Sequence, residues 1–514
     1  MKIVIIGGVA GGASAAARLR RLDEQAEIVV FERTGYMSYA NCGLPYYIGG
    51  VIRDEADLTL QTPESFYARF RINVRVRQEV TSIDRAAKTV SVRPLDGGSP
   101  YTEHYDKLIL SPGARPVKPP LPGVDSARVF TLRTVEDTLR LRAQAMSAGS
   151  GSAVIVGGGF IGVELAENFR ELGLRVTIVE KQPQLLGQFD ADMVSFLHAH
   201  LREKGVGLLL GRSVERFAET ADGIIVHTDG GALPQADMAV LAIGVTPENT
   251  LSEAAGLELG ARGAIAVDAH MRTSDPDIYA VGDAVEVIDR TTGRRTTVAL
   301  AGPANRQGRV AADNICSLPS VYRGAAGSSV LKVFDRTAAS TGISERTARG
   351  LGIDCAAVIL SPLSHASYYP GAQVMTLKLV FETPSGKLLG AQIVGGDGVD
   401  KRIDVLATAI QAGLTAFDLC DLELSYAPPY SSAKDPVNMA GFMIENIAKG
   451  VLKQWHLADA LPRDGSVTLL DTRTVGEFDG GHIDGFLNIP VDELRDRLDE
   501  VAPGKPVYVM CQSG

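Results

Sequence analysis

Two glycine-rich turns, each joining a strand pattern to a helix pattern, constrain the fold of this chain more than any other feature. In the first, the apolar run KIVIIG leads into Gly7-Gly8-Val9-Ala10-Gly11-Gly12, a helical pattern follows, and the strand EIVVFE ends at Glu32. This order is typical of a βαβ unit, in which glycines let the backbone approach a pyrophosphate and the helix N-terminus supplies amide donors. The terminal carboxylate is well placed to bind ribose hydroxyls.

The same pattern occurs a second time. A strand over Ser152–Val156 leads into Gly157-Gly158-Gly159-Phe160-Ile161-Gly162, which fits GxGxxG fully, and the strand RVTIVE ends at Glu180. The first copy has Val9 at the middle glycine position. One such turn can lack a ligand, but two copies with strand, helix and terminal acid predict an α/β chain with two Rossmann-like dinucleotide-binding domains. Glu180 favours NADH, because a carboxylate repels a 2′-phosphate, and Lys181 weakens that preference.

Length and composition limit the remaining possibilities. A chain of 514 residues exceeds one typical core, so several domains are expected. The net charge of -10, with no long basic run, argues against nucleic acid or an anionic membrane as the main partner. No uninterrupted apolar run reaches about 18 residues, so no membrane span is predicted. The five cysteines are widely spaced and lack a CxxC, which favours a reducing cytoplasm over a disulfide scaffold or a metal site.

Two further stretches fit a protein that binds two nucleotides. KLILSPGA, which contains Ser111 and Gly113, is a strand that runs into a turn of small residues. DIYAVGD ends in Gly282 and Asp283, where a carboxylate could accept hydrogen bonds from the ribityl hydroxyls of a flavin. With the two turns, these stretches resemble the pyridine nucleotide-disulfide oxidoreductases. The resemblance implies FAD in the first unit and NADH or NADPH in the second, held by Gly7, Gly8, Gly11, Gly12, Glu32, Ser111, Gly113, Gly157, Gly159, Gly162, Glu180, Gly282 and Asp283.

The stretch SYANCGLPYY contains one cysteine, Cys42, and no second cysteine lies near it in the sequence. A single thiol beside a flavin can form a mixed disulfide with a small thiol, or it can be oxidised to a sulfenic acid by peroxide or oxygen. A buried structural cysteine is the alternative without redox chemistry. Asn41, Gly43 and Pro45 form a loop-to-helix junction, which is expected to lower the pKa of the thiol.

The flanking residues favour the mixed disulfide. SYANCGLPYYIGG resembles the active-site segment of coenzyme A-disulfide reductases, whereas single-cysteine NADH oxidases and peroxidases have a related segment without the Asn-Cys-Gly-Leu-Pro-Tyr run. HASYYPGA and SYAPPYSSAKDP resemble the dimerisation-domain motifs of the same family. The resemblance implies a homodimer with shared active sites, in which Tyr426 and Tyr368, or its neighbour Tyr369, reach the cysteine of the partner. It also implies a coenzyme A site formed by Ser14, Arg18, Arg21, Ser38, Asn41 and Lys434, whose three cations suit phosphate groups.

After Lys449 the pattern changes. A connector leads into a strand VTLLD, a turn EFDGGHIDGFLNIP, a helix VDELRDRL and a strand PVYVM that ends before Cys511. This segment resembles a rhodanese domain, with its Asp-x-Arg, Glu-Phe and Gly-His-Ile elements. In rhodaneses the cysteine begins a loop whose backbone amides hold an anion. Because three residues follow Cys511, we expect a truncated, partial rhodanese-like α/β domain, with Cys511 as a catalytic candidate that lacks its loop.

Together these patterns predict a multidomain redox enzyme. The expected activity is FAD-dependent, NAD(P)H-driven reduction of coenzyme A persulfide, polysulfide or coenzyme A disulfide through a Cys42 mixed disulfide, with release of coenzyme A thiol and hydrogen sulfide. The alternatives are an NADH oxidase or peroxidase with a Cys42 sulfenic acid, a sulfurtransferase, and a flavin-binding interaction protein. The expected domains are FAD-binding (1–112 and 242–322), NAD(P)H-binding (113–241), α/β dimerisation (325–445), a linker (446–462) and rhodanese-like (463–514).

Overall fold

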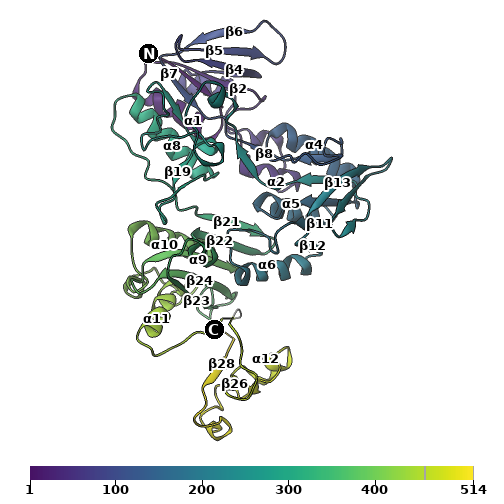
Figure 1. The fold of residues 1–514 in the computed structure, drawn as a ribbon, viewed down its shortest axis with the longest axis vertical. Helices are drawn as coiled ribbons and strands as arrows, with labels where there is room; N and C mark the ends of the chain where they lie inside the picture. Colours follow the sequence, from purple (N-terminus) through teal and green to yellow (C-terminus); the bar gives the residue numbers. More distant parts are fainter. Residues whose placement is uncertain (457–458, 513–514) are drawn as a thin grey trace. The chain divides into compact units, whose positions relative to one another are not determined.

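The computed structural model describes residues 1–456 and 459–512. Residues 457–458 of the expected linker and residues 513–514 of the expected rhodanese-like domain lie outside the described residues. The chain forms two compact units (Figure 1), the first made of Met1–Gly187 and Leu197–Gly327 and the second of Gln188–Phe196 and Ser328–Gly514. Within the described ranges, every helix is too short or too polar to cross a membrane.

The first unit contains a parallel five-stranded sheet with the strand order β18-β7-β1-β2-β3. Four of its strands are almost wholly apolar and buried, as expected for a parallel sheet that is covered on both faces, whereas the edge strand β3 is only partly buried. α1 lies directly against α8. The two helices are so close that a Cβ added at Gly308 would come within 2.4 Å of the Gly11 carbonyl oxygen. The elements are β1 (Lys2–Ile6), α1 (Ala10–Leu22), β2 (Glu27–Glu32), β3 (Asn73–Val76), β7 (Lys107–Leu110), β18 (Ile278–Ala280) and α8 (Ala301–Ile315).

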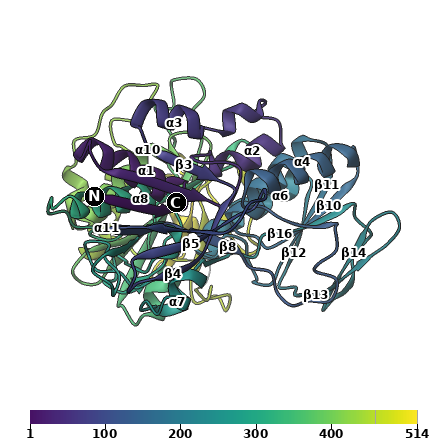
Figure 2. The same ribbon diagram turned by 90° about the horizontal axis from the view of Figure 1, so that it is seen from above.

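A second parallel sheet in the same unit has the order β12-β11-β10-β16-β9. Figure 2 shows its strands β10, β11, β12 and β16 gathered together, with β13 and β14 beside them. A capping box between Thr134 and Asp137 starts the helix that follows β9. The elements are β9 (Val129–Thr131), α4 (Val135–Ala148), β10 (Ser152–Val156), α5 (Phe160–Glu171), β11 (Arg175–Glu180), β12 (Val206–Leu210) and β16 (Met238–Leu241). Both predicted βαβ units are therefore present.

Smaller elements complete the first unit. Antiparallel pairing joins β4-β5-β6, β13-β14-β15, β8-β17 and β19-β20. Three short helices, α2 (Leu44–Ile48), α3 (Pro63–Phe70) and α7 (Thr250–Ala254), lie in the connections. The strands are β4 (Gln78–Asp84), β5 (Thr89–Pro94), β6 (Tyr101–His104), β8 (Ala114–Pro116), β13 (Val214–Glu219), β14 (Ile224–Thr228), β15 (Gly231–Ala232), β17 (Val245–Pro247), β19 (Val287–Ile288) and β20 (Arg295–Thr296).

The second unit is built on an antiparallel sheet with the order β21-β22-β25-β24-β23. The expected strands VMTLKLVFE and KLLGAQIVG form its two buried central strands, and their apolar side chains share one core with α10 and α11. The elements are α6 (Ala191–Glu203, which continues into the first unit), β21 (Ser329–Val333), β22 (Arg336–Gly342), α9 (Glu345–Gly350), β23 (Cys355–Leu360), β24 (Met375–Glu382), β25 (Leu388–Gly395), α10 (Val399–Ala412) and α11 (Pro436–Ala448).

The C-terminal part of this unit is a three-stranded parallel sheet with the order β27-β26-β28. One expectation here is wrong: the stretch VDELRDRL forms turns and a short 3-10 helix at Leu498–Glu500 instead of an α-helix. Val491 and Leu498 are exposed, so the helix would have had no apolar surface on which to pack, and a short helix without packing is marginal. The elements are β26 (Thr468–Asp471), α12 (Val475–Asp479), β27 (Leu487–Asn488) and β28 (Val507–Met510).

Candidate active site

The first glycine-rich turn packs tightly against Ser111, the residue that follows β7. Gly7 has a φ of 97°, and a Cβ on it would lie 2.0 Å from the Ser111 carbonyl oxygen. A Cβ on Gly12 would lie 1.9 Å from the Gly7 carbonyl oxygen, and one on Gly11 would lie 2.9 Å from Val281. Only glycine fits at Gly7 and Gly12. The fold also brings the turn, Ser111 and the DIYAVGD segment into contact, as the resemblance implied.

The second turn repeats this geometry and leaves open space at its helix end. Gly157 has a φ of 108°, and a Cβ on Gly162 would lie 2.1 Å from the Gly157 carbonyl oxygen. Gly159 is the N-cap of α5, and a Cβ there would meet no atom within 4 Å. A helix N-terminus with free space in front of it fits a dinucleotide pyrophosphate.

The two acids that end the second strands hold the turns in shape. Glu32 accepts hydrogen bonds from the Gly8 amide at 2.9 Å and from the Thr34 amide at 2.8 Å. Glu180 accepts from the Gly158 amide and from the Gln182 amide, both at 2.7 Å. Each carboxylate therefore stands at the edge of its turn with a negative charge, and its contact with a ribose stays a prediction.

The predicted flavin residues near Asp283 have partners that the sequence did not reveal. The Arg133 guanidinium pairs with the Asp283 carboxylate at 2.9 Å, and a Cβ on Gly113 would lie 3.1 Å from the same guanidinium. The Gly282 amide donates to the Gln307 side chain at 2.7 Å. Neither Arg133 nor Gln307 belongs to a recognisable motif, so only the folded chain identifies them.

Cys42 lies in a 3-10 turn, Asn41–Gly43, that leads directly into α2. Its side chain is exposed. α2 packs against α5, with the Tyr46 hydroxyl 3.5 Å from the Glu164 carboxylate. A Cβ on Gly49 would come within 2.0 Å of the Asn168 side chain, so the two helices approach closely. The thiol segment is thus joined to the helix that begins at the second glycine-rich turn.

The surroundings of Cys42 raise its pKa, which corrects the expectation of a lowered value. Desolvation of the thiol by the surrounding protein raises its pKa most, and the charges of Glu164 and Asp283 act in the same direction, against the smaller effect of Arg133. The expected helix effect fails because α2 has only five residues and carboxylates face the thiol. Burial also raises the pKa of Glu164 to about 7, with Glu167 contributing.

Five of the six residues assigned to coenzyme A lie in the first unit. On α1, the Ser14 hydroxyl contacts Asn305 at 2.8 Å, and the Arg18 guanidinium pairs with Asp313 at 2.6 Å. The third α1 residue, Arg21, lies over the ring of Phe70. The six assigned residues are Ser14, Arg18, Arg21, Ser38, Asn41 and Lys434. The remaining first-unit members precede the thiol: the Ser38 amide donates to the Gly8 carbonyl at 2.8 Å, and the Asn41 amide donates to Tyr39. Lys434 is exposed in the second unit, just before α11.

The second unit brings two predicted tyrosines together. The hydroxyls of Tyr368 and Tyr426 are 2.7 Å apart, and both side chains are exposed, by 73% and 47%. Tyr369 instead meets the His365 ring edge-on, with the ring centroids 5.6 Å apart. The tyrosine pair lies at a cavity of about 580 Å³ that His365 and Met439 also line. The geometry thus separates the two neighbouring tyrosines and places Tyr368 with Tyr426.

The rhodanese-like motifs also meet in space. Asp471 is fully buried, and its carboxylate accepts hydrogen bonds from Arg473 Nε, at 3.0 and 3.1 Å, and from Arg473 Nη2, at 2.7 Å. The rings of Phe478 and His482 are stacked with centroids 3.7 Å apart. Cys511 is exposed directly after β28. Its catalytic role stays a prediction.

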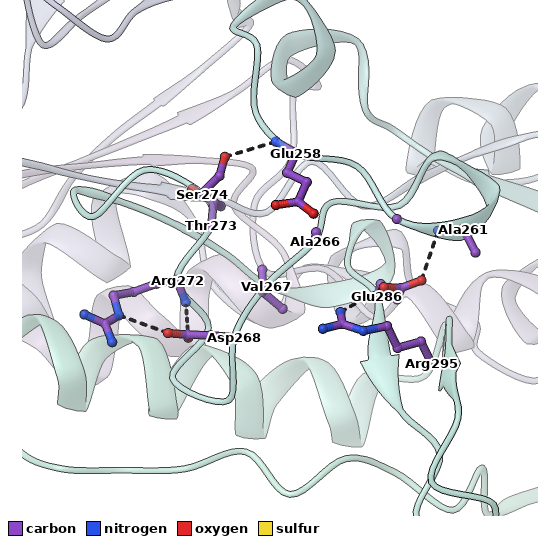
Figure 3. Close-up of a pocket in the computed structure, with 11 residues that line it drawn as sticks. Glu258, Ala261, Ala266, Val267, Asp268, Arg272, Thr273, Ser274, Glu286 and Arg295 are labelled. Carbon is purple, nitrogen blue, oxygen red and sulfur yellow. Dashed lines mark hydrogen bonds and ion pairs between the residues drawn. The ribbon is translucent and has the colours of Figure 1, made fainter.

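A separate cavity of about 510 Å³ lies in the first unit beside β20 (Figure 3). Its charged groups largely satisfy one another, since Arg295 pairs with Glu286 at 2.9 Å and Arg272 pairs with Asp268 at 3.2 Å. The Ala261 amide also donates to Glu286. A cavity whose charges are already paired offers little to a charged ligand, so the candidate site is the one around Cys42.

Three family models match consecutive parts of the chain. Residues 1–308 match the family "Pyridine nucleotide-disulphide oxidoreductase", residues 328–436 match its dimerisation domain, and residues 455–514 match the "Rhodanese-like domain". A "Coenzyme A disulfide reductase" of Staphylococcus aureus (strain JH9) is 34% identical over 442 residues, which cover 86% of this chain and 99% of the relative.

Two solved structures are similar over nearly the whole chain. Reduced Bacillus anthracis CoADR-RHD shares 49% identity with a TM-score of 0.95, covering 99% of this chain and 92% of that one. An NAD-dependent persulfide reductase from A. fulgidus shares 38% identity with a TM-score of 0.95, covering 99% and 94%. The chain therefore belongs to the pyridine nucleotide-disulphide oxidoreductase family.

Proposed function

We propose that this chain is an FAD-dependent NAD(P)H oxidoreductase that reduces coenzyme A persulfide, polysulfide or coenzyme A disulfide through a mixed disulfide on Cys42. The observation that carries the proposal is the position of Cys42: a free, exposed thiol on the segment that packs against the helix of the second nucleotide turn. The similar proteins named above for coenzyme A disulfide and persulfide reduction support the same chemistry. The absence of disulfides among the described residues and the predicted cytoplasmic location fit a thiol enzyme.

The residues present fit both cofactors. The turn at Gly7 to Gly12, with Glu32, would hold FAD, and the open turn at Gly157 to Gly162, with Glu180, would hold the nicotinamide nucleotide. The negative charge of Glu180 at the edge of its turn favours NADH over NADPH. Bound FAD supplies the two-electron transfer between the nicotinamide and the sulfur chemistry.

Cys42 carries the sulfur chemistry in the proposed cycle. Its thiolate attacks the coenzyme A sulfur of a persulfide, the sulfur–sulfur bond of the substrate breaks, and hydrosulfide leaves. The product is a disulfide between Cys42 and coenzyme A. Two electrons and one proton then return the Cys42 thiolate and release coenzyme A thiol. With coenzyme A disulfide as substrate, the first leaving group is coenzyme A thiolate instead of hydrosulfide.

The hydroxyl pair of Tyr368 and Tyr426 would act at the leaving sulfur. Two phenols that share a hydrogen bond can donate a second one to a developing thiolate, or protonate it. The match to a dimerisation domain supports a homodimer. In the proposed dimer each tyrosine pair serves the Cys42 of the partner subunit. By analogy between fused domains, the match of residues 455–514 to a rhodanese-like domain favours persulfide and polysulfide substrates.

The test is anaerobic oxidation of NADH by the holoenzyme with coenzyme A persulfide, followed through released sulfide. The parent is compared with Cys42→Ser and, as a control thiol, with Cys316→Ser. Fast sulfide release that depends on Cys42 and not on Cys316 is the expected result. Consumption of NADH only when oxygen or peroxide is admitted would replace the proposal with an oxidase or peroxidase that forms a Cys42 sulfenic acid.

A further inference from the structure

We propose that Arg402, in the first turn of α10, is the positioning residue that sets the Tyr368–Tyr426 hydroxyl pair. This inference rests on the proposed function for the chemical importance of the tyrosines, but the placement itself is argued from contacts within the second unit. Figure 1 shows α10 and α11 in that unit, together with β23 and β24.

The tyrosines stand on two irregular segments that need an external support. Tyr368 lies between β23 and β24, and Tyr426 lies between a short 3-10 helix and α11. Both side chains are exposed, so packing alone fixes neither of them. One backbone bond joins the two segments, from the Ala366 amide to the Ser431 carbonyl at 3.1 Å.

Arg402 binds both segments with one side chain. It is 1% exposed, and its Nη2 donates to the Ser364 carbonyl at 3.0 Å on the first segment. On the second segment the same nitrogen reaches the Tyr430 carbonyl at 3.3 Å and the Ser431 hydroxyl at 3.1 Å. Ser364 is four residues from Tyr368, and Tyr430 is four residues from Tyr426. The guanidinium therefore holds each tyrosine segment close to its functional residue.

Asp435 completes the support and connects it to α11. Its carboxylate accepts from Arg402 Nε at 3.2 Å and from Nη2 at 3.0 Å, and it also accepts from Ser431 at 2.8 Å. It is the N-cap of α11, where it receives the Val437 amide at 3.0 Å. The neighbouring Lys401 reaches the Ser425 carbonyl at 3.2 Å, next to Tyr426. The first turn of α10 thus contacts the second segment at both ends.

The geometry requires arginine and not merely a positive charge. The guanidinium is planar, so Nε donates to the Asp435 carboxylate while the two N–H groups of Nη2 are shared among the acceptors on both segments. A lysine at this position would keep the charge opposite Asp435 but could not reach both segments at once. Arg402→Lys is therefore a conservative change that removes the connection and retains the ion pair.

The experiment compares hydrogen exchange and kinetics of the holoenzyme for the parent and Arg402→Lys. Arg20→Lys is the matched control, since Arg20 is also buried and donates to several carbonyls, including those of Phe70 and Ala26, in the first unit. Exchange of amides in 362–370 and 423–434 is expected to rise about tenfold in Arg402→Lys, while β24 and β25 and the control keep their protection. A uniform rise over the whole second unit, or no rise in the two segments, would overturn the inference.

A double-mutant cycle with Tyr426→Phe separates positioning from a general loss of fold. If Arg402 acts through the tyrosines, Arg402→Lys lowers kcat about tenfold in the parent, leaves KM for NADH unchanged, and adds almost nothing in the Tyr426→Phe background. Losses that multiply would show an independent structural role and overturn the inference. If Tyr426→Phe alone keeps full activity, the tyrosine chemistry of the proposed function fails, and the exchange experiment still decides the positioning.

Discussion

At the scale of single residues, the sequence located Cys42 but misjudged its electrostatics. The motif around it predicted a loop that leads into a helix, and that geometry is present. The sequence could not show that Glu164, far away in the chain, would face this segment, nor that Asp283 would act on the thiol together with Arg133. A pKa depends on which charges the fold brings together, and spacing along the chain does not report that.

The coupling between Glu164 and Cys42 predicts a specific pH dependence of thiol reactivity. The Glu164 carboxyl ionises as pH rises through about 7, and its negative charge then raises the pKa of Cys42. Glu164→Gln removes this charge, so Cys42 should be alkylated by iodoacetamide several-fold faster than in the parent above that pH, and at an equal rate well below it. Glu171→Gln, exposed on the same helix, is the control. Equal rates at every pH would contradict the assignment.

At the scale of elements, periodicity and glycine spacing predicted the nucleotide-binding parts well. The strands EIVVFE and RVTIVE have the predicted bounds as β2 and β11, because their buried apolar runs and the glycine turns are local features. The helix expected at VDELRDRL did not form. Its helical pattern is a local feature, but a short helix also needs an apolar surface from other elements to pack on, and the sequence does not show whether one is present. Arg133 and Arg402 escaped notice for the same reason: their partners lie in other elements.

The second glycine-rich turn predicts a specific consequence of one alanine substitution. A Cβ on Gly159 meets no protein atom, so Gly159→Ala should fold normally and fill space needed by the nucleotide. We expect KM for NADH to rise about tenfold, which corresponds to about 1.4 kcal/mol, with unchanged flavin content. Gly350→Ala is the control, because a Cβ on Gly350, at the end of α9 in the second unit, also meets no protein atom within 4 Å. Unchanged affinity in Gly159→Ala would place the nucleotide elsewhere.

At the scale of the whole molecule, the chain combines two dinucleotide-binding sheets, an antiparallel sheet that carries the tyrosine pair, and a small parallel sheet with rhodanese-like motifs. The repeated glycine-rich turns predicted the two dinucleotide-binding sheets. The resemblance to known families predicted the dimerisation and rhodanese-like parts. The assignment of Gln188–Phe196 to the second unit had no counterpart in the sequence. Buried Lys378, which pairs with Asp192 at 2.7 Å and with Glu345 at 2.8 Å, ties this segment to the antiparallel sheet.

If each tyrosine pair serves the partner's Cys42, as we propose, two inactive variants should complement each other. Cys42→Ser and Tyr426→Phe/Tyr368→Phe proteins are each expected to be nearly inactive. When they are unfolded together and refolded, a mixed dimer with shared sites contains one intact site, so random pairing should restore about a quarter of the parental activity. Sites built within single subunits would all carry one defect, and the mixture would then stay as inactive as its components.

The most direct test of the central claim is the mass of the Cys42 peptide. Holoenzyme treated with coenzyme A disulfide is digested without reductant and compared before and after anaerobic addition of NADH. The account predicts one coenzyme A joined to Cys42 in each subunit, absent from Cys42→Ser and released by NADH. Coenzyme A on another cysteine, or an adduct on Cys42 that NADH does not release, would contradict it.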